Sequence, residues 1–227
     1  MAQKTYIIGD IHGCLTPFDR LLEKIAPVSN KDTLIILGDM IDRGPDSSKV
    51  LERLIELRAQ HQNVIALKGN HEAMFLDFLE GKKQNFFLIN GGDNAVRSYG
   101  IENPYSKDVL ANIPEEHVMF LQKLLPYWED EHHIFVHAGI QPGVDLERQS
   151  PEWLYWARSN FIEDISDFGK TVIFGHTPFR ETLVQPNKIG IDTGAVYGGK
   201  LTCLVLPDMK FVSVPGERHW IRGAELT

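Results

Sequence analysis

The sequence predicts an α/β fold in which helices and strands form packed layers. Seven short β-rich runs recur along the chain, and most are continuous apolar stretches typical of strands buried on both faces. Longer segments with helical spacing of apolar residues separate these runs, and this alternation favours α/β layers. With 227 residues and 43% apolar content, the chain can bury one substantial core. We therefore expect one domain over residues 1–227.

The first part of the chain alternates strands with helices. Its strands are expected at residues 5–10, 32–39 and 63–70. Helical segments fill the intervals, at residues 15–27 and 44–60. We expect Thr16 to cap the first helix with Pro17 at its first position, and Pro45 to open the second, because proline fits the first turn of a helix.

The rest of the chain holds further strands and a helical segment. The stretch around residues 75–130 lacks strand signals, so we expect a mainly helical insertion there, with Pro114 opening one helix. Ser150, Pro151 and Glu152 indicate the start of a later helix. The remaining strands are expected at residues 132–139, 171–178, 189–194 and 200–206.

Composition and charge exclude several classes of protein. The formal net charge is −8 and no dense basic stripe appears, which argues against sequence-independent binding to nucleic acid. No apolar run reaches membrane-spanning length, and the N-terminus lacks the features of a secretion signal. Cys14 and Cys203 are too few for a disulfide framework and suit core packing in a reducing cytoplasm. We expect a cytoplasmic monomer without a membrane partner.

Five predicted strands end in side chains that bind metals or move protons. Singly, each of these residues fits a turn or a structural hydrogen bond. Because sites in α/β sheets form beyond the carboxyl ends of strands, five such endings predict one shared crevice. The side chains concerned are Asp10, His12, Asp39, Asn70, His137 and His176.

The donor set of these six residues favours two divalent ions. Three imidazoles, two carboxylates and one amide offer nitrogen and oxygen without thiolate, which suits manganese, iron or zinc, and we expect manganese. Six ligands are too many for one ion, whereas two ions sharing Asp39 account for them. Asp10 and His12 would complete the ligand set of one ion. Asn70, His137 and His176 would complete that of the other. Such ions let an acidic protein hold a phosphate dianion.

The motifs around these residues resemble a known family. "GDIHG", "GDMIDRG" and "GNHE", followed by "HAG" and "GHTP", are similar to the signature of the phosphoprotein phosphatase family within the calcineurin-like metallophosphoesterases. The motifs run from residue 9 to residue 177, which is most of the chain. The resemblance implies a two-layered β-sandwich flanked by helices, two metal ions and the same six ligands.

The resemblance also implies roles in phosphate ester hydrolysis. A water shared by the two ions would attack phosphorus in line, without a phosphoenzyme. Arg43 would bind phosphoryl oxygens, and His71 would protonate the leaving group while Asp42 orients it and favours its charged form. "LYWARSNF" nominates Arg158 as a second phosphate-binding arginine, the alternative being a surface helix residue.

Two nearby carboxylates allow more than one interpretation. Glu72 is expected either at the start of a helix or behind the metal ligands. Asp192 is expected either to form a turn or to hydrogen-bond a metal-bound histidine.

Two substrates fit these motifs. The segment "LINGGDNAVRSYG" resembles small bacterial protein phosphatases, so we expect a serine/threonine protein phosphatase that acts on phosphoproteins. The alternative is a symmetrical bis(5'-nucleosyl)-tetraphosphatase, which should carry aromatic groups near the crevice. Trp153, Tyr155 and Trp156 fit that role, or equally the core face of a helix. A catalytically silent metal-binding scaffold is disfavoured because the motifs are intact.

Overall fold

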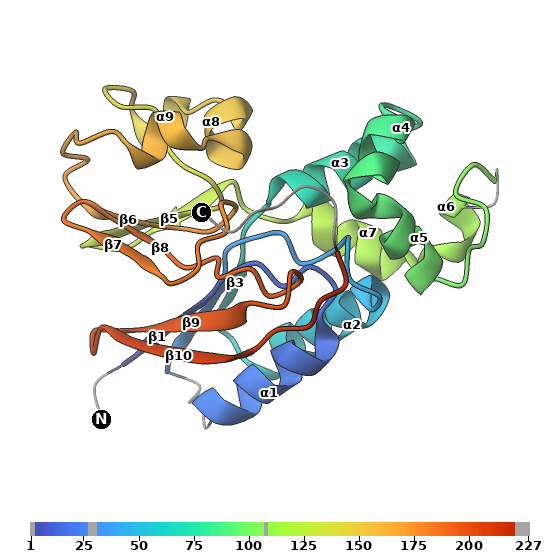
Figure 1. Ribbon diagram of the computed structural model, residues 1–227, viewed down its shortest axis with the longest axis horizontal. Coiled ribbons are helices and arrows are strands. Elements are labelled where there is room, and N and C mark those ends of the chain that lie inside the picture. The colour runs from blue at the N-terminus through green and yellow to red at the C-terminus, as the bar shows by residue number, and fades with distance from the viewer. Residues whose placement is uncertain (1–2, 27–30, 107–108, 221–227) are drawn as a thin grey trace.

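Two mixed β-sheets face each other between layers of helices in the computed structural model, which describes residues 3–26, 31–106 and 109–220 (Figure 1). The first sheet has the order β10-β9-β1-β2-β3 and the second the order β4-β5-β6-β8-β7. Within them, β1, β2 and β3 run parallel, as do β5, β6 and β8. The predicted α/β class is confirmed, and so is the two-layered sandwich that the family resemblance implies.

The strands are short. Those of the first sheet are β1 (Thr5–Ile8), β2 (Thr33–Ile36), β3 (Val64–Ala66), β9 (Lys200–Leu206) and β10 (Lys210–Pro215). Those of the second are β4 (Tyr127–Glu129), β5 (His133–Val136), β6 (Thr171–Phe174), β7 (Leu183–Gln185) and β8 (Lys188–Gly190).

Some helices cover the outer faces of the sheets, and α3 to α7 lie beside them (Figure 1). The α-helices are α1 (Leu15–Ile25), α2 (Ser47–Gln60), α3 (Asn70–Leu79), α4 (Gln84–Phe87), α5 (Asp93–Ser98), α6 (Val109–Asn112), α7 (Glu115–Gln122), α8 (Pro151–Trp156) and α9 (Ser159–Ile162). Two further turns of helix are η1 (Leu88–Gly92) and η2 (Leu146–Arg148). In Figure 1, α1 and α2 lie against the first sheet and α8 and α9 against the second. None of the helices within the described ranges is long and apolar enough to cross a membrane.

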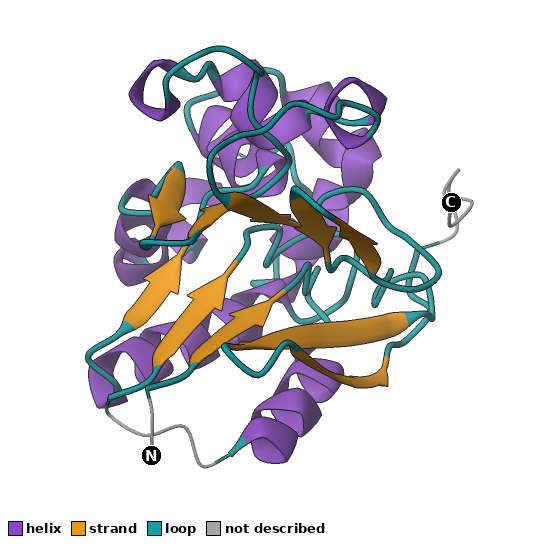
Figure 2. Ribbon diagram, turned by 90° about the vertical axis from the view of Figure 1, so that its left-hand side faces the viewer, coloured by secondary structure: helices purple, strands orange, loops and turns teal. Residues whose placement is uncertain are grey.

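The period-2 alternation of strand side chains divides the core. In β1, Ile7 joins a buried cluster between the two sheets, together with Phe135 and Ile173 of the second sheet. Its neighbour Ile8 points the other way, into the cluster beneath the helices. Both faces of this strand are therefore buried, which explains its continuous apolar sequence. Figure 2 shows the strands of both sheets between helices.

Every predicted strand is present, but three others were not expected. β4, β7 and β10 lie at sheet edges, and their residues are largely half-buried or exposed, so they lack the apolar run of a buried strand. β4 also lies inside the stretch that was expected to contain no strand.

The helix starts were predicted with mixed success. The signal at α8 is confirmed, with Ser150 as the N-cap and Pro151 as the first residue. α1 begins earlier than expected, because the carbonyl of Cys14 already accepts from the Phe18 N–H. α2 begins two residues after Pro45, because the Ser48 N–H donates to Ser98 Oγ and not to the carbonyl of Gly44, as a helix opened by Pro45 would require. Pro114 caps α7 rather than being its first residue.

Candidate active site

The carboxyl ends of parallel strands from both sheets place the six proposed metal ligands together. In the first sheet, β1 is followed by Asp10 and His12, β2 by Asp39, and β3 by Asn70. β5 leads into His137 and β6 into His176. All six side chains are buried. The strand endings therefore converge as the sequence predicts, and two sheets contribute to the cluster.

Asp39 lies at the centre of this cluster. Its carboxylate oxygens are 3.5 Å from His12 Nε2 and 3.3 Å from His137 Nε2. Ligand atoms of Asp39, His137 and His176 all lie within 4.8 Å of one another, as do those of Asp39, His12 and His71. Asp39 is thus shared by two groups of donors, and the group that includes His12 contains His71 where Asp10 was expected.

The other two ligands close the cluster. Asn70 Oδ1 is 3.0 Å from His137 Nε2. Both carboxylate oxygens of Asp10 accept from the backbone N–H of His176, at 3.0 and 3.1 Å. Gly175 precedes His176, and a Cβ there would come within 2.2 Å of Asp10 Oδ1, so glycine is required for this approach.

The imidazoles are oriented by backbone carbonyls. His12 Nδ1 is 2.9 Å from the carbonyl oxygen of Ile41, and His137 Nδ1 is 2.9 Å from that of Leu37. With a proton on each Nδ1, the Nε2 atoms facing Asp39 carry free lone pairs, as metal ligation requires. His176 Nε2 is buried and has no hydrogen-bond partner among the described residues.

Burial favours the uncharged form of every titratable group in the cluster. It raises the pKa of Asp39 to about 7, against the opposing effect of the Arg43 guanidinium. It raises the pKa of Asp10 well above its usual value and lowers the pKa of His137 to about 4. Neutral imidazoles and desolvated carboxyls are suitable ligands for cations, whose charge would favour ionised aspartates. The donor set, its burial and the unpartnered His176 nitrogen therefore fit divalent metal ions.

His71 and Asp42 form a buried pair beside the cluster. His71 Nδ1 is 2.6 Å from Asp42 Oδ2, while His71 Nε2 has no hydrogen-bond partner within the described part of the chain. Burial and then the Arg43 charge lower the pKa of His71 well below its usual value, and burial raises that of Asp42. Burial therefore opposes the charged imidazole that Asp42 was expected to favour. His71 Nε2 is also only 3.9 Å from Asp39 Oδ2.

The two proposed phosphate-binding arginines are placed differently. Arg43 Nη1 is 2.8 Å from His12 Nε2, and the guanidinium carbon lies 5.7 Å from the ring centre of Tyr197. Arg158 is exposed and caps α9. Its charge nevertheless lowers the pKa values of Asp39 and His137, so it lies close enough to act on the cluster.

Glu72 holds together two of the loops that carry ligands. Its carboxylate oxygens accept from the backbone N–H groups of Gly69 at 2.9 Å, Asp39 at 2.9 Å and Met40 at 2.7 Å. Both interpretations of Glu72 are therefore correct, since it sits at the start of α3 and behind a ligand. For Asp192, the turn is confirmed, because its Oδ1 accepts from the Gly194 N–H at 2.9 Å.

Strained backbone is concentrated at this site. His12, Asp39, Asp42, Arg43 and His176 all have positive φ values, between 46° and 71°. Residues other than glycine rarely adopt this left-handed backbone conformation. Those that do tend to cluster at functional sites.

Some residues at the site were not singled out from the sequence. Gly91 and Asn94 hydrogen-bond the backbone of Arg43, and Phe86 contacts Trp156. The glycine pair in "LINGGDN" is a signal for a special backbone conformation, but it does not indicate what lies opposite.

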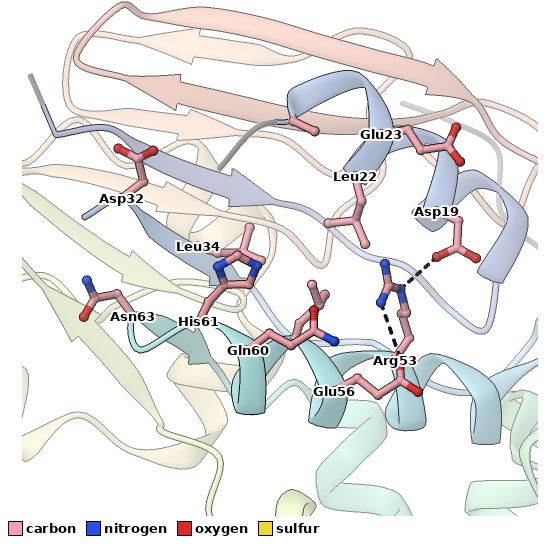
Figure 3. Close-up of a pocket in the computed structure, with 12 residues that line it drawn as sticks. Asp19, Leu22, Glu23, Asp32, Leu34, Arg53, Glu56, Gln60, His61 and Asn63 are labelled. Atoms are coloured by element: carbon pink, nitrogen blue, oxygen red, sulfur yellow. Dashed lines mark hydrogen bonds and ion pairs between the residues drawn. The ribbon is translucent and has the colours of Figure 1, made fainter. Parts of the chain in front are cut away.

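A cavity of about 620 Å³ lies away from the cluster, between α1 and α2 (Figure 3). Arg53 projects into it and is paired with Asp19 and Glu56, at 3.2 and 3.3 Å. The cavity adjoins Asp32 and Asn63, which precede β2 and β3, so it opens at the opposite strand ends from the cluster.

Comparison with known families defines the class of the protein. The family model described as calcineurin-like phosphoesterase matches residues 3–223. The chain therefore belongs to the calcineurin-like metallophosphoesterases, hydrolases of phosphate esters, and the predicted family is confirmed. Enzymes of this fold use divalent metal ions, for which the Asp39 cluster supplies candidate ligands.

More specific similarities concern nucleotide-cleaving enzymes. The chain is 32% identical to the asymmetrical bis(5'-nucleosyl)-tetraphosphatase PrpE of Bacillus cereus (strain AH187), over 95% of each chain. It is 28% identical to the protein of the same name from Oceanobacillus iheyensis, over 96% of this chain and 94% of the relative. A solved structure named as a candidate diadenosine tetraphosphatase has a TM-score of 0.73 at 25% identity, covering 95% of this chain and 94% of its own.

A protein phosphatase shares the fold at lower identity. The serine/threonine phosphatase structure from Saccharomyces cerevisiae, similar to human PP5, has a TM-score of 0.61 at 15% identity. The alignment covers 98% of this chain and 82% of the yeast protein. At this identity the similarity concerns the fold alone.

Proposed function

We propose that the protein hydrolyses dinucleoside tetraphosphates in a metal-dependent reaction. The observation that carries this proposal is the end-to-end similarity, at 32% identity, to enzymes named for that activity. It reverses the order of the two substrates favoured by the sequence motifs, where the protein phosphatase came first. Those relatives are named asymmetrical, so we propose cleavage into unequal nucleotides rather than the symmetrical cleavage first considered.

The roles proposed for the site residues follow from their positions. Asp10, His12 and Asp39 would hold one ion. Asn70, His137 and His176 would hold a second ion, and Asp39 would be shared between the two. Divalent ions in these positions, with manganese expected, would neutralise phosphoryl charge and increase the acidity of bound water.

Arg43 and His71 would act on the substrate itself. To bind a phosphoryl group, Arg43 would exchange its contact with His12 Nε2 for phosphoryl oxygens, to which its planar guanidinium can donate two hydrogen bonds. Arg158 would add a second, exposed positive charge. His71 Nε2, buried and unpartnered among the described residues, would hold the proton that the leaving oxygen accepts, and Asp42 would fix the ring through Nδ1.

An aromatic side chain supports a nucleotide substrate. The ring centre of Trp156 lies 6.4 Å from that of His176, and that of Phe86 lies 6.0 Å from Trp156. Trp153 and Tyr155 pack against the core of the second sheet, and Trp156 packs against the core beneath the helices of the first sheet. Of these three aromatic residues, Trp156 is the one whose ring contacts His176, so we propose that it stacks against a base.

We expect Trp156→Ala to raise KM for diadenosine tetraphosphate about 5- to 150-fold, because stacking of a base on an aromatic ring contributes about 1–3 kcal/mol. Hydrolysis of tripolyphosphate, which has no base, should change less than about twofold. Trp128→Ala is the matched control, since Trp128 is exposed on β4. Steady-state kinetics on both substrates measure this, and equal losses would remove Trp156 from base binding.

The substrate proposal is tested by product analysis. Purified protein with manganese should convert diadenosine tetraphosphate to AMP and ATP, separated by ion-exchange chromatography. Two molecules of ADP would indicate the symmetrical alternative. A kcat/KM for phosphoserine peptides well above that for diadenosine tetraphosphate would overturn the proposal.

The buried His71–Asp42 pair favours a second candidate, the serine/threonine protein phosphatase. A serine alkoxide is a poor leaving group that needs a proton, whereas a nucleotide phosphate leaves more readily without one. We expect His71→Asn to lower kcat about 100-fold or more for phosphoserine peptides and far less for p-nitrophenyl phosphate. Parallel kinetics measure the difference, and equal losses on both substrates would argue against the proton-donor role.

A further inference from the structure

The turn that carries Asp42 and Arg43 is held by a segment outside its own motif. Arg43 has a φ of 67° and Asp42 a φ of 71°, so two consecutive residues with a Cβ adopt the left-handed region. Such a conformation is unfavourable on its own and persists only where surrounding contacts impose it. The contacts around this turn therefore determine the position of the Arg43 Cα atom, from which its side chain extends.

We propose that Gly91 and Asn94 form a clasp that positions Arg43 for phosphate binding, with Asn94 as a positioning residue. The proposal rests on the proposed function of Arg43 as a phosphate-binding group. The clasp binds both backbone polar groups of Arg43. The Arg43 N–H donates to the carbonyl of Gly91 at 2.9 Å, and Asn94 Nδ2 donates to the carbonyl of Arg43 at 2.5 Å.

Gly91 brings the clasp into contact with the turn. It has a φ of 101°, and a Cβ at this position would come within 2.6 Å of Arg43 Cγ. Only glycine combines this backbone conformation with so close an approach. The second glycine of the pair, Gly92, packs against the ring of Phe87 in the same way, so the segment is fixed on its other side as well.

The clasp is anchored to the body of the protein. Asn94 belongs to α5, whose Ala95 and Val96 are buried in the core beneath the helices. The end of α5 is joined to the start of α2, because Ser48 N–H donates to Ser98 Oγ at 3.0 Å and Ser48 Oγ donates to the Ser98 carbonyl at 2.8 Å. The clasp and the helix that follows the Asp42–Arg43 turn are thus joined to each other.

The position of the Arg43 backbone matters because it determines whether the guanidinium can reach phosphoryl oxygens. Its Nη1 is 2.8 Å from His12 Nε2, and its Nε is buried without a hydrogen-bond partner in the described ranges. A planar group that must meet phosphoryl oxygens beside the metal ligands tolerates little displacement. Loss of the Asn94 hydrogen bond would free the turn and misplace these donors.

The test compares two asparagines of one segment. Asn94→Ala should weaken binding of inorganic phosphate to the manganese-loaded protein about tenfold, since one hydrogen bond contributes up to about that factor. Asn90→Ala is the matched control. Asn90 Nδ2 also donates to a backbone carbonyl, at 2.7 Å, but within its own helical segment, so phosphate affinity should stay unchanged. Isothermal titration calorimetry gives the affinities, and elemental analysis should show unchanged metal content.

A double mutant separates positioning from a general structural effect. In an Arg43→Ala background, Asn94→Ala should have less than about a twofold further effect on phosphate affinity, because the group it positions is gone. An equal loss in both backgrounds, or no loss from Arg43→Ala itself, would overturn the proposal. If Asn94→Ala does not fold, Asn94→Asp serves instead, since it keeps the shape and removes the donor. These readouts use phosphate, so they stand apart from whether dinucleoside tetraphosphates are hydrolysed.

Discussion

At the scale of single residues, Asp39 is the carboxylate that both groups of candidate metal ligands share. It follows β2 in the left-handed region, with a φ of 46°, and faces histidines that follow strands of both sheets. Its backbone N–H is bound by Glu72, which also binds the N–H of Gly69. One carboxylate is therefore fixed by contacts from several separate loops.

We expect Asp39→Asn to reduce bound manganese from about two ions to fewer than one per chain, because both donor groups share this residue. Asp192→Asn is the control. Asp192 is a buried carboxylate nearby, but it bonds the Gly194 N–H in a turn, and this variant should keep both ions. Elemental analysis after dialysis measures the ratio. Full occupancy in Asp39→Asn would exclude a bridging role.

The candidate metal ligands could be predicted because they lie close together in sequence, in short motifs. Asp10 and His12 lie in one short motif, as do Asn70, His71 and Glu72, and each motif ends a strand that is recognisable from its apolar run. Gly91 and Asn94 could not be predicted as partners of Arg43. The hydrogen bond between Asn94 and Arg43 joins residues 51 positions apart, and no pattern in the sequence records such a contact.

At the scale of elements, the second sheet is joined to its helices by a buried lysine. Lys188 of β8 donates through Nζ to the carbonyls of Phe161 and Asp164, at 2.5 and 2.6 Å. The same Nζ lies 4.4 Å from the ring centre of Phe161. This contact fixes the segment that begins with Arg158, and burial lowers the pKa of Lys188.

Lys188→Met should lower the free energy of unfolding by about 2–3 kcal/mol, because two buried carbonyls lose a charged donor. Lys170→Met is a suitable comparison. Lys170 binds Glu129 and the carbonyl of Asp130 near the surface and should change stability by less than about 1 kcal/mol. Urea denaturation measures both variants. Equal stability of the two would show that the buried contact adds nothing.

The elements themselves were predicted unevenly, for a physical reason. Strands buried on both faces, such as β1 and β6, have a continuous apolar sequence that identifies them. Edge strands such as β10 pair with one neighbouring strand and include polar residues, here Lys210 and Ser213, so they lack a continuous apolar run. Helix starts depend on which backbone groups are already bonded, as the Ser48–Ser98 hydrogen bond at the start of α2 illustrates.

At the scale of the whole molecule, the candidate metal centre joins the two sheets. Asp10, His12, Asp39 and Asn70 follow strands of the first sheet, whereas His137 and His176 follow strands of the second. Ions bound by both sets would link the layers as well as support the chemistry.

Manganese should therefore raise the melting temperature of the metal-free protein in a concentration-dependent way. At 100 times the dissociation constant, a ligand of the folded state adds about 2.7 kcal/mol to the free energy of unfolding. Addition of a chelator should return the melting temperature to its metal-free value. Differential scanning calorimetry across a manganese series measures the effect. A melting temperature independent of manganese would argue against ions held between the layers.

The division of the ligands between the two sheets also has a consequence for biosynthesis. A nascent chain that has emerged only through β3 and α3 carries four of the six ligand residues and none of the histidines that follow β5 and β6. Such an unfinished chain cannot assemble the complete centre, however much manganese surrounds it. The protein could thus hydrolyse phosphate esters only after His176 has been synthesised and the two sheets have packed together. Activity would therefore appear late in folding.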